Sequence, residues 1–486
     1  MARLLLRPLP VAALVWFVLS LTAARGDAND AFPDSQSIIV PAERPNDITL
    51  ATNFGLVSTT DGGATWTWAC EVPASNNAHL YQVGAAPGRR LFALSTAQGT
   101  NDRRLVFTDD RACGWQVSGG LLASALVLDA FPDPSDPRRV LAIAATTAGA
   151  APAAHGLFES GDGGATFTQM RYMAPAGDQL TGAEIARSDP KFIYVTVSSG
   201  AMLLPRLLQS TDGGAHWTSF DLQASLGGTS IRLIAVDPER PERVFLRASG
   251  AQDDKLAIAV VDASGGISVK VVLTASGGRL AAFVRLPSKT ILTAGAVGAN
   301  LAPALFRSTD GGDTFAPVPN PPHLRALAAR ASRVFAAADL QQDGFALGAS
   351  ADEGMTWQPL MRLDQVGTIQ GCLKDACQTS CHLQVDNHLW SLSTCEANDG
   401  PAATPDAGTS DAGTSDGGTS LPPPSSGGGC QVGRGGGGGR GVALGALFVL
   451  AAALVFRRTL SHKRLRDVAA REQAARHDRK ARMESE

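Results

Sequence analysis

A short motif that recurs along the chain is the strongest constraint on its fold. The full motif reads hydroxyl residue, any residue, Asp, Gly, Gly, two further residues and an aromatic residue. Full copies occupy residues 59–66, 160–167, 210–217 and 308–315. Two weaker copies follow the same order at 108–115, where Arg111 and Ala112 replace the glycines, and at 350–357, where Glu353 replaces the first glycine. A chain with such internal self-similarity is expected to fold as a repeat.

A seventh, degraded copy at residues 262–269 carries Ser264 at the Asp position. The Asp-equivalent positions are therefore 61, 110, 162, 212, 264, 310 and 352, spaced 42 to 52 residues apart. A period near 50 residues is long enough for one small sheet per unit. The spacing indicates seven structural units.

Each unit also carries the same succession of short apolar runs. One run precedes a Pro in most copies, as in 233–238; a second follows, as in 243–246; a third enters the motif, and a fourth leaves it through the aromatic residue. Four short strands joined by Gly- and Pro-rich turns are typical of a propeller blade. We therefore predict an all-β fold, a seven-bladed β-propeller of four-stranded blades over residues 36–363. Closure into a ring removes exposed sheet edges.

The motif resembles the Asp-box, or BNR repeat, of the sialidase-like and photosystem-assembly-factor-like propellers. The residue types have structural uses: Gly-Gly permits positive φ in a tight turn, the carboxylate can accept backbone N–H groups, and the aromatic ring can fill the space between sheets. A Ca²⁺ site is the alternative, but one carboxylate per turn supplies too few ligands. The predicted structural residues are Asp61, Asp110, Asp162, Asp212, Asp310, Asp352, Trp66, Trp115, Phe167, Trp217, Phe315 and Trp357.

The N-terminus has the pattern of a secretory signal over residues 1–28. Arg3 and Arg7 precede an apolar core at 10–21, and small residues follow it. An uncleaved N-terminal anchor is the alternative. The sequence thus predicts export.

The C-terminal part begins with a low-complexity spacer at 397–429, which lacks the apolar residues needed to fold. Cys430, a Gly-rich stretch, an apolar run at 441–456 and an Arg pair follow. This order resembles the myxobacterial-type C-terminal sorting signal (MYXO-CTERM), here residues 430–458. The resemblance implies a transmembrane helix at 441–456, cleavage near Cys430 by a sortase-like protease, lipid on that Cys, and display at the cell surface or outer membrane.

The remaining residues, 459–486, depart from that signal, which usually ends soon after the arginines. They carry acid-to-base pairs at i,i+4, which favours an exposed basic helix. A simple membrane anchor that keeps its tail is therefore the alternative to sorting, and a basic tail suits the cytoplasmic side.

Six cysteines remain besides Cys430. Cys70 and Cys113 lie at equivalent edges of adjacent units, so a bridge between them is expected. Cys372, Cys377, Cys381 and Cys395 fall in a segment, 364–396, that we predict to be a small disulfide cap with three possible connectivities. A zinc site with His382 and His388 is the alternative, but the spacing fits no common zinc pattern and an oxidising compartment favours disulfides.

Catalytic residues are not evident. Sialidases have six blades, an Arg-Ile-Pro motif and a Tyr nucleophile, and none of Tyr81, Tyr172 and Tyr194 can be matched to that Tyr. We expect the polar residues near the ends of the innermost strands to line a wet central channel without chemistry, and a two-carboxylate glycosidase is the alternative. These residues are Asp129, Glu184, Arg187, Asp237 and Arg285. We expect no cofactor and no metal.

Charge and loop composition point to binding. Residues 29–430 contain 27 Lys and Arg against 39 Asp and Glu, a net of −12, which disfavours nucleic acid. Loops between second and third strands, such as 98–103, 146–155, 249–255 and 293–303, vary most and contain no Trp or Tyr, so we expect a broad polar surface. The predicted function is a non-catalytic surface propeller that binds a protein or an envelope glycan. The alternative is an exo-acting glycoside hydrolase or lyase on extracellular polysaccharide.

Overall fold

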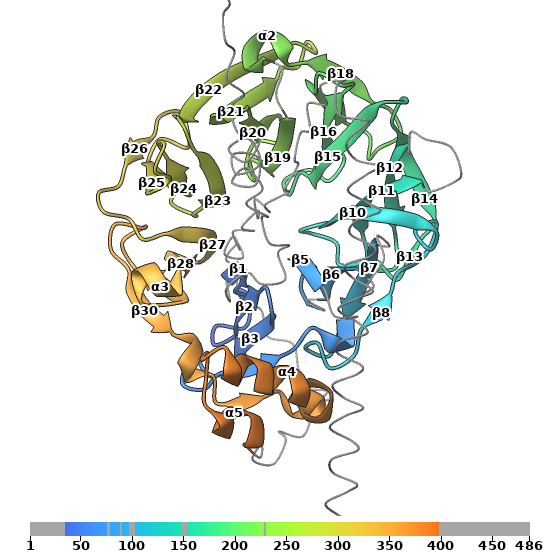
Figure 1. Ribbon diagram of the computed structural model, residues 1–486. Coiled ribbons are helices and arrows are strands. Elements are labelled where there is room, and N and C mark those ends of the chain that lie inside the picture. The colour runs from blue at the N-terminus through green and yellow to red at the C-terminus, as the bar shows by residue number, and fades with distance from the viewer. Residues whose placement is uncertain are drawn as a thin grey trace, which may run out of the picture. The chain divides into compact units, whose positions relative to one another are not determined.

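The computed structural model describes residues 35–397, except 75–77, 88–89, 97–102, 147–153 and 228–229. Seven sheets, each built on four antiparallel strands, are arranged around a central axis (Figure 1). The chain is a seven-bladed β-propeller. The predicted all-β fold and its blade count are therefore confirmed.

The blades are numbered in chain order. Blade 1 comprises β1 (Ser35–Ile39), β2 (Ile48–Thr52), β3 (Gly55–Thr59) and β4 (Thr67–Ala69), and blade 2 comprises β5 (Ala78–Val83), β6 (Leu91–Thr96), β7 (Arg103–Thr108) and β8 (Gln116–Val117). Blade 3 comprises β10 (Ala125–Pro132), β11 (Val140–Thr146), β12 (His155–Ser160) and β14 (Gln169–Met173). Blade 4 comprises β15 (Asp178–Ile185), β16 (Ile193–Ser199), β17 (Leu204–Ser210) and β18 (Thr218–Asp221). Blade 5 comprises β19 (Ser230–Val236), β20 (Arg243–Ser249), β21 (Asp254–Val261) and β22 (Ile267–Ala275). Blade 6 comprises β23 (Arg279–Arg285), β24 (Ile291–Val297), β25 (Ala302–Ser308) and β26 (Ala316–Pro317). Blade 7 comprises β27 (Leu324–Arg330), β28 (Arg333–Ala338), β29 (Leu347–Ser350) and β30 (Gln358–Met361).

The first strand of each blade lies nearest the axis and the fourth lies at the rim (Figure 1). Because consecutive strands are antiparallel, the turns between strands 1 and 2 and between strands 3 and 4 share one side of the ring, and the connections between strands 2 and 3 lie on the other. We call these sides the turn face and the loop face. The seven motif copies span the turns between strands 3 and 4, so they all lie on the turn face.

Every innermost strand contains a register irregularity against its second strand, as between Val127 and Asp129 in β10 and between Leu233 and Ala235 in β19. A bulge increases the local twist of a strand. Its recurrence in all seven blades fits sheets that must turn sharply around a narrow axis.

The core lies between the blades rather than inside one layer. Second strands are buried on both faces; six of the seven residues of β11 are buried, for example. Each sheet therefore packs against a neighbour on both sides, which explains why these strands read as continuous apolar runs. Phe245 of blade 5 and Phe283 of blade 6 illustrate the contact, with ring centroids 5.2 Å apart.

The ring closes where blade 7 packs against blade 1, in a cluster that includes Ile38, Leu50 and Phe335. The chain then adds β31 (Thr368–Ile369) parallel to β4 as a fifth strand of blade 1. Beyond it lie α4 (Lys374–Asp386) and α5 (Leu392–Glu396). Short elements complete the described chain: β9 (Gly119–Gly120) with β13 (Thr166–Phe167), α2 (Gln223–Leu226), α3 (Leu340–Asp343), η2 (Val72–Ala74), η3 (Leu363–Gln365) and η4 (Gly371–Leu373).

Candidate functional site

Six of the seven motif turns share one hydrogen-bond pattern. The hydroxyl of the first residue donates to the Asp carboxylate at 2.6–2.8 Å and accepts the backbone N–H of the fifth residue. The same carboxylate accepts the backbone N–H of the seventh residue at 2.8–3.1 Å. The aspartates of this set are all exposed yet all engaged within their own turns: Asp61, Asp110, Asp162, Asp212, Asp310 and Asp352.

In five of these turns the pKa of the Asp carboxyl is lowered: Asp61, Asp162, Asp212, Asp310 and Asp352. The hydroxyl of Thr356 donates to Asp352 and lowers the pKa of that carboxyl to about 2. The hydroxyls of Thr59 and Thr65 likewise hold the pKa of Asp61 well below its usual range. Hydrogen bonds to the charged form cause such depression. A carboxylate committed in this way is a turn-stabilising group and a poor proton donor.

In the degraded turn of blade 5, the carboxylate and the hydroxyl exchange positions. Asp262 stands at the hydroxyl position and accepts from the backbone N–H groups of Ser264 and Gly266, at 2.8 and 2.9 Å. Ser264, at the Asp position, donates its hydroxyl to the same oxygen at 2.5 Å. One carboxylate thus replaces both groups, which explains how the turn persists although the motif is hard to recognise.

The aromatic residues of the motif point into the protein. Trp66 and Phe167 are buried, and the others are half-buried: Trp115, Trp217, Phe315 and Trp357. Trp217 packs against Tyr172 of blade 3 with ring centroids 5.7 Å apart and donates its indole N–H to the Arg171 carbonyl. It therefore joins two blades.

Arginines supply a second repeated contact between blades. Arg90, Arg139 and Arg243 each come directly before or at the start of a second strand, and each donates to the carbonyl of the first motif glycine of the next blade, at 2.7–3.4 Å. We call this contact the strut. Between blades 6 and 7 its direction is reversed, because Thr290 occupies the arginine position and Glu353 occupies the glycine position. The Glu353 carboxylate accepts from Thr290 at 2.8 Å.

The two motif glycines differ in what surrounds them. A Cβ on Gly213, the first glycine of blade 4, would meet nothing within 4 Å, whereas one on Gly312, the second glycine of blade 6, would lie 2.9 Å from Phe245 of blade 5. Both have positive φ. We expect Gly213→Ala to cost about 1 kcal/mol for the left-handed backbone and Gly312→Ala about 2–3 kcal/mol, since it also disturbs the blade interface. Equilibrium denaturation of both variants measures the difference, and equal losses would contradict it.

The segment after blade 7, which we call the cap (residues 363–397), is fastened to blades 1 and 2. On either side of β31, the Gly367 N–H donates to Trp66 O and the Gln370 N–H donates to Trp68 O. Trp390 packs on Trp68, with ring centroids 5.1 Å apart. These contacts cover the outer edge of blade 1. They make the end of the described chain a part of the ring's first sheet.

Two disulfides reinforce this attachment. Cys70 pairs with Cys377 and Cys113 with Cys372, while Cys381 pairs with Cys395 inside the cap. The expected disulfides are confirmed. Among the residues described here, no cluster of His, Cys, Asp or Glu suits a metal. The expected Cys70–Cys113 bridge is wrong, as is a cap with two internal bridges. The returning chain lies between the two blades and takes both partners.

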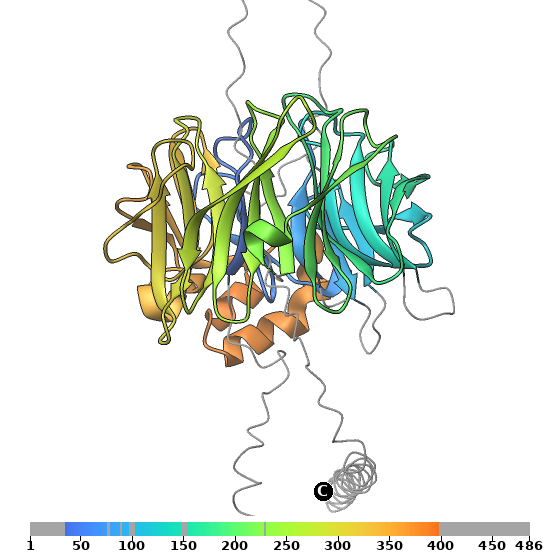
Figure 2. The ribbon, with the colours of Figure 1, turned by 90° about the horizontal axis from the view of Figure 1, so that it is seen from above.

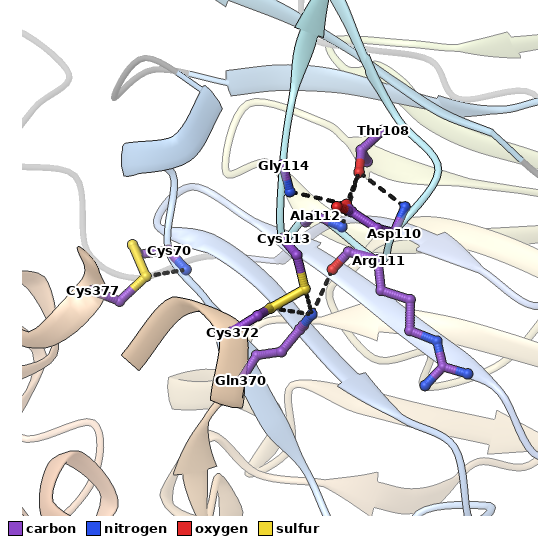
Figure 3. Close-up of a disulfide and its surroundings, with 10 residues drawn as sticks. All are labelled: Cys70, Thr108, Asp110, Arg111, Ala112, Cys113, Gly114, Gln370, Cys372 and Cys377. Carbon is purple, nitrogen blue, oxygen red and sulfur yellow. Dashed lines mark hydrogen bonds between the residues drawn. A yellow bond between two sulfur atoms is a disulfide. The ribbon is translucent and has the colours of Figure 1, made fainter. Parts of the chain in front are cut away.

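Figure 3 shows how the cap holds the motif turn of blade 2. Arg111 and Ala112 stand where other turns have glycines and keep the left-handed backbone, at φ 59° and 71°. The Gln370 amide donates to Arg111 O at 2.7 Å and contacts Cys113 Sγ at 3.2 Å. The bridge and this amide stabilise a turn that its own sequence disfavours.

Glu71, next to Cys70, is a half-buried carboxyl whose pKa is raised to about 7 by loss of hydration. Below pH 4.5, the unperturbed pKa of this carboxyl, the group is protonated in both the folded and the unfolded state, and the free energy of unfolding is unaffected. As the pH rises from 4.5 toward 7, the unfolded state ionises first, so the free energy of unfolding falls. We expect Glu71→Gln to match the unchanged protein at pH 4 and to exceed it by about 2 kcal/mol at pH 8, allowing for partial exposure. Thermal denaturation across this range tests it; parallel pH profiles would be the contrary result.

The polar residues predicted near the axis are held in ion pairs. Asp129 of β10 pairs with Arg232 of β19. These strands belong to blades 3 and 5, which are not neighbours, so the pair crosses the central channel. Asp237 is 3% exposed and pairs with the equally buried Arg243 at 3.1 Å. Both carboxylates therefore contribute to the fold.

The other predicted polar residues and the tyrosines are also engaged. Arg285 lies 3.7 Å from Asp237 and 3.3 Å from Glu239, and Glu184 and Arg187, near the end of β15, are not without partners. Tyr194 is fully buried and donates to Pro241 O at 2.7 Å. Tyr81 is 3% exposed. Both tyrosine rings are therefore closed to solvent.

The loop face carries exposed apolar side chains that the sequence reasoning missed. Met202 is 70% exposed in blade 4 and Leu301 is 58% exposed in blade 6. Their loops are built alike: Gly200 N–H donates to Gly177 O and Leu203 N–H to Gly200 O, and Gly298 and Leu301 form the equivalent bonds in blade 6. The repeated Gly-Ala-x-Leu-x-Pro pattern at 200–205 and 298–303 was the available signal. The loop face of blades 4 and 6 is thus less polar than expected.

The backbone of these loops is strained at matching positions. Leu203 and Leu301 adopt φ of 53° and 50°, in a region that branched side chains rarely occupy. Strained residues concentrate where a protein holds a particular group for use. We take the two loop tips as the candidate site.

The other predicted features lie outside the described residues: the signal at 1–28, most of the spacer at 397–429, Cys430, the helix at 441–456 and the tail at 459–486. Among the helices that the structure describes, none is both long and apolar enough to cross a membrane. These expectations stay predictions.

No family model and no curated protein matches the chain. Similar solved structures include the GH74 xyloglucanase from Xanthomonas campestris (15% identity, 67% of this chain, 58% of that chain, TM-score 0.38). YCF48 from Cyanidioschyzon merolae is 13% identical over 63% of this chain and 92% of its own, with a TM-score of 0.43. A prolyl endopeptidase structure is 14% identical over 72% and 53%, with a TM-score of 0.49. The likeness shows the fold alone. The chain spans less than two thirds of the xyloglucanase.

Proposed function

We propose that this protein is a non-catalytic binding propeller, exported and displayed at the cell surface, which contacts its envelope partner through the loop face. The repeated turns are proposed to be Asp-boxes, and residues 430–458 to act as the MYXO-CTERM-type signal, with processing by a sortase-like protease and lipid on Cys430. Three disulfides support export, since such bonds persist in oxidising compartments.

The observation that carries the binding function is the pair of matched, strained loops that expose Met202 and Leu301. Exposing these apolar side chains to water contributes nothing to the stability of the fold, so we explain an apolar tip on a strained turn by a contact with a partner. The ion pairs of Asp129 with Arg232 and of Asp237 with Arg243 support the same proposal, because both carboxylates already contact an arginine of the fold.

The test compares the full chain with a Met202→Ser, Leu301→Ser double variant for retention on isolated envelope membranes and polysaccharide. Met355→Ser on the turn face is the matched control, because Met355 is 48% exposed. We expect the double variant alone to lose retention. Incubation with envelope polysaccharides followed by mass spectrometry tests the hydrolase alternative: a product that disappears on changing Asp129, Glu184 or Asp237 would overturn the proposal.

A further inference from the structure

The three disulfides differ in their exposure to solvent. Four of the six bridged cysteines are buried, with at most 5% of the residue exposed: Cys70, Cys377, Cys381 and Cys395. Cys372 is exposed, and its partner Cys113 is half-buried. Cys372 lies in η4, directly before the cap helices that Figure 2 shows in orange on one side of the ring. Solvent therefore reaches the Cys113–Cys372 bridge in the folded protein, whereas the other two bridges are closed to it.

One side-chain amide contacts both sulfurs of the exposed bridge (Figure 3). Gln370 Nε2 lies 3.2 Å from Cys113 Sγ and 3.5 Å from Cys372 Sγ. The same nitrogen donates to Arg111 O at 2.7 Å, which fixes the amide and leaves its second N–H for the sulfurs. A hydrogen-bond donor stabilises a sulfur that becomes a thiolate. Because its contact with the amide is shorter, Cys113 is the better leaving group of the two.

We propose that the Cys113–Cys372 bridge is a thiol-exchange site, at which an external small thiol forms a mixed disulfide with Cys372. The incoming thiolate attacks the sulfur of the exposed residue, Cys372, and forms a new S–S bond with it. The bond between the two protein sulfurs breaks, and its electron pair leaves on Cys113 Sγ, beside the Gln370 amide. Atoms and electrons balance, because one disulfide and one thiolate give another disulfide and another thiolate.

The second long bridge makes this modification reversible. Cys70–Cys377 is buried, so it stays closed and keeps the cap on the ring while the exposed bridge is open. Cys113 therefore remains beside Cys372 at a high effective concentration. Its thiolate attacks Cys372 Sγ, closes the bridge again and expels the small thiol as a thiolate. Cys113 is the resolving cysteine of the pair.

The exchange acts on the motif turn of blade 2. Arg111 and Ala112 hold the left-handed backbone in this turn, at φ 59° and 71°, although neither is a glycine. When the bridge opens, the turn keeps the Gln370 bond to Arg111 O but loses its covalent link to the cap. The site thus couples the thiol content of the surroundings to the order of one turn, independently of the ligand that the loop face binds.

The first test compares the three bridges within one molecule. The full chain in a Cys430→Ser background is treated without denaturant with dithiothreitol, which is oxidised to its cyclic disulfide as a bridge is reduced to two thiols. Acid quenching, alkylation and peptide mass spectrometry follow each cysteine with time. We expect Cys113 and Cys372 to be alkylated at least about 100-fold faster than the other four, whose sulfurs react only while the structure is locally open. Equal rates for all three bridges would overturn the proposal.

The second test identifies the sulfur that is attacked. Brief treatment with reduced glutathione and rapid acid quenching should place glutathione on Cys372 and leave Cys113 as the thiol; an adduct on Cys113 would overturn the assignment. After glutathione is removed, the adduct should decay as the bridge closes. A Cys113→Ser chain loaded with oxidised glutathione is the matched control and should keep the adduct on Cys372. Decay at the same rate in that control would overturn the resolving role of Cys113.

The third test concerns Gln370, which acts as a positioning residue through its amide. Gln370→Met should slow the reduction of the exposed bridge about threefold, because only part of the thiolate charge has developed in the transition state. In a Cys372→Ser chain, the same change should move the midpoint of Cys113 alkylation to higher pH. An unchanged midpoint would overturn the role of the amide. In every variant, intact Cys70–Cys377 and Cys381–Cys395 bridges verify that the chain remains folded.

Discussion

Removing both bridges between cap and ring is expected to cost more than the two single removals combined. Cys70→Ala with Cys377→Ala, and Cys113→Ala with Cys372→Ala, should each lower the free energy of unfolding by about 4 kcal/mol. The fourfold variant should lose about 10 kcal/mol instead of 8. Guanidinium denaturation of the oxidised proteins measures all three.

The reason lies in the loops that the bridges close. The bridges span 307 and 259 residues, and either one alone keeps the whole ring cross-linked. Removing one bridge therefore frees only the chain that lies in one loop and not in the other, which is 307 − 259 = 48 residues. Removing the second releases the long loop, whose closure entropy corresponds to about 5–6 kcal/mol in the chain-entropy description.

The cap's internal bridge is the control. Cys381 and Cys395 are 14 residues apart, so Cys381→Ala with Cys395→Ala should cost about 3 kcal/mol. That loss should add to the others without excess, because the short loop shares no segment with the ring. Strict additivity of the two long bridges would show that closure entropy of the ring is not what they contribute.

The blade count could be read from the sequence because each blade is a local unit. The hydroxyl, Asp and Gly residues of a motif such as 210–217 bond almost entirely within eight residues, so the physics that fixes the turn is visible in one window. Even the degraded copy was located correctly. Its chemistry was not, because Asp262 performs the work expected at position 264.

Contacts between distant segments could not be read in the same way. Cys70 and Cys113 are neighbours in the ring, but their partners arrive from more than 250 residues away, and pairing depends on where the returning chain lies. The struts were recoverable in part: Arg90, Arg139 and Arg243 occupy the same position in three units. The sequence does not indicate which carbonyl of the next blade each arginine contacts.

The strut of blade 5 offers the other large effect. Arg243 is 3% exposed; it pairs with Asp237 at 3.1 Å and donates to Gly311 O at 2.7 Å. Arg243→Met keeps the apolar stem but leaves the buried Asp237 carboxylate with the Glu239 N–H, at 3.1 Å, and two more distant arginines, Arg240 and Arg285, each at 3.7 Å. Breaking a buried pair from one side is expected to cost about 3–5 kcal/mol.

Two further variants separate charge from geometry. Arg243→Lys retains the cation but cannot reach Asp237 and the Gly311 carbonyl together, because only a guanidinium presents donors in a fixed fork. It should therefore lose about 2 kcal/mol by denaturant titration. Arg138→Met removes an arginine that is 78% exposed and should change stability by less than about 0.5 kcal/mol. If Arg243→Met behaved like Arg138→Met, apolar packing alone would join blades 5 and 6, and the struts would be incidental to the ring.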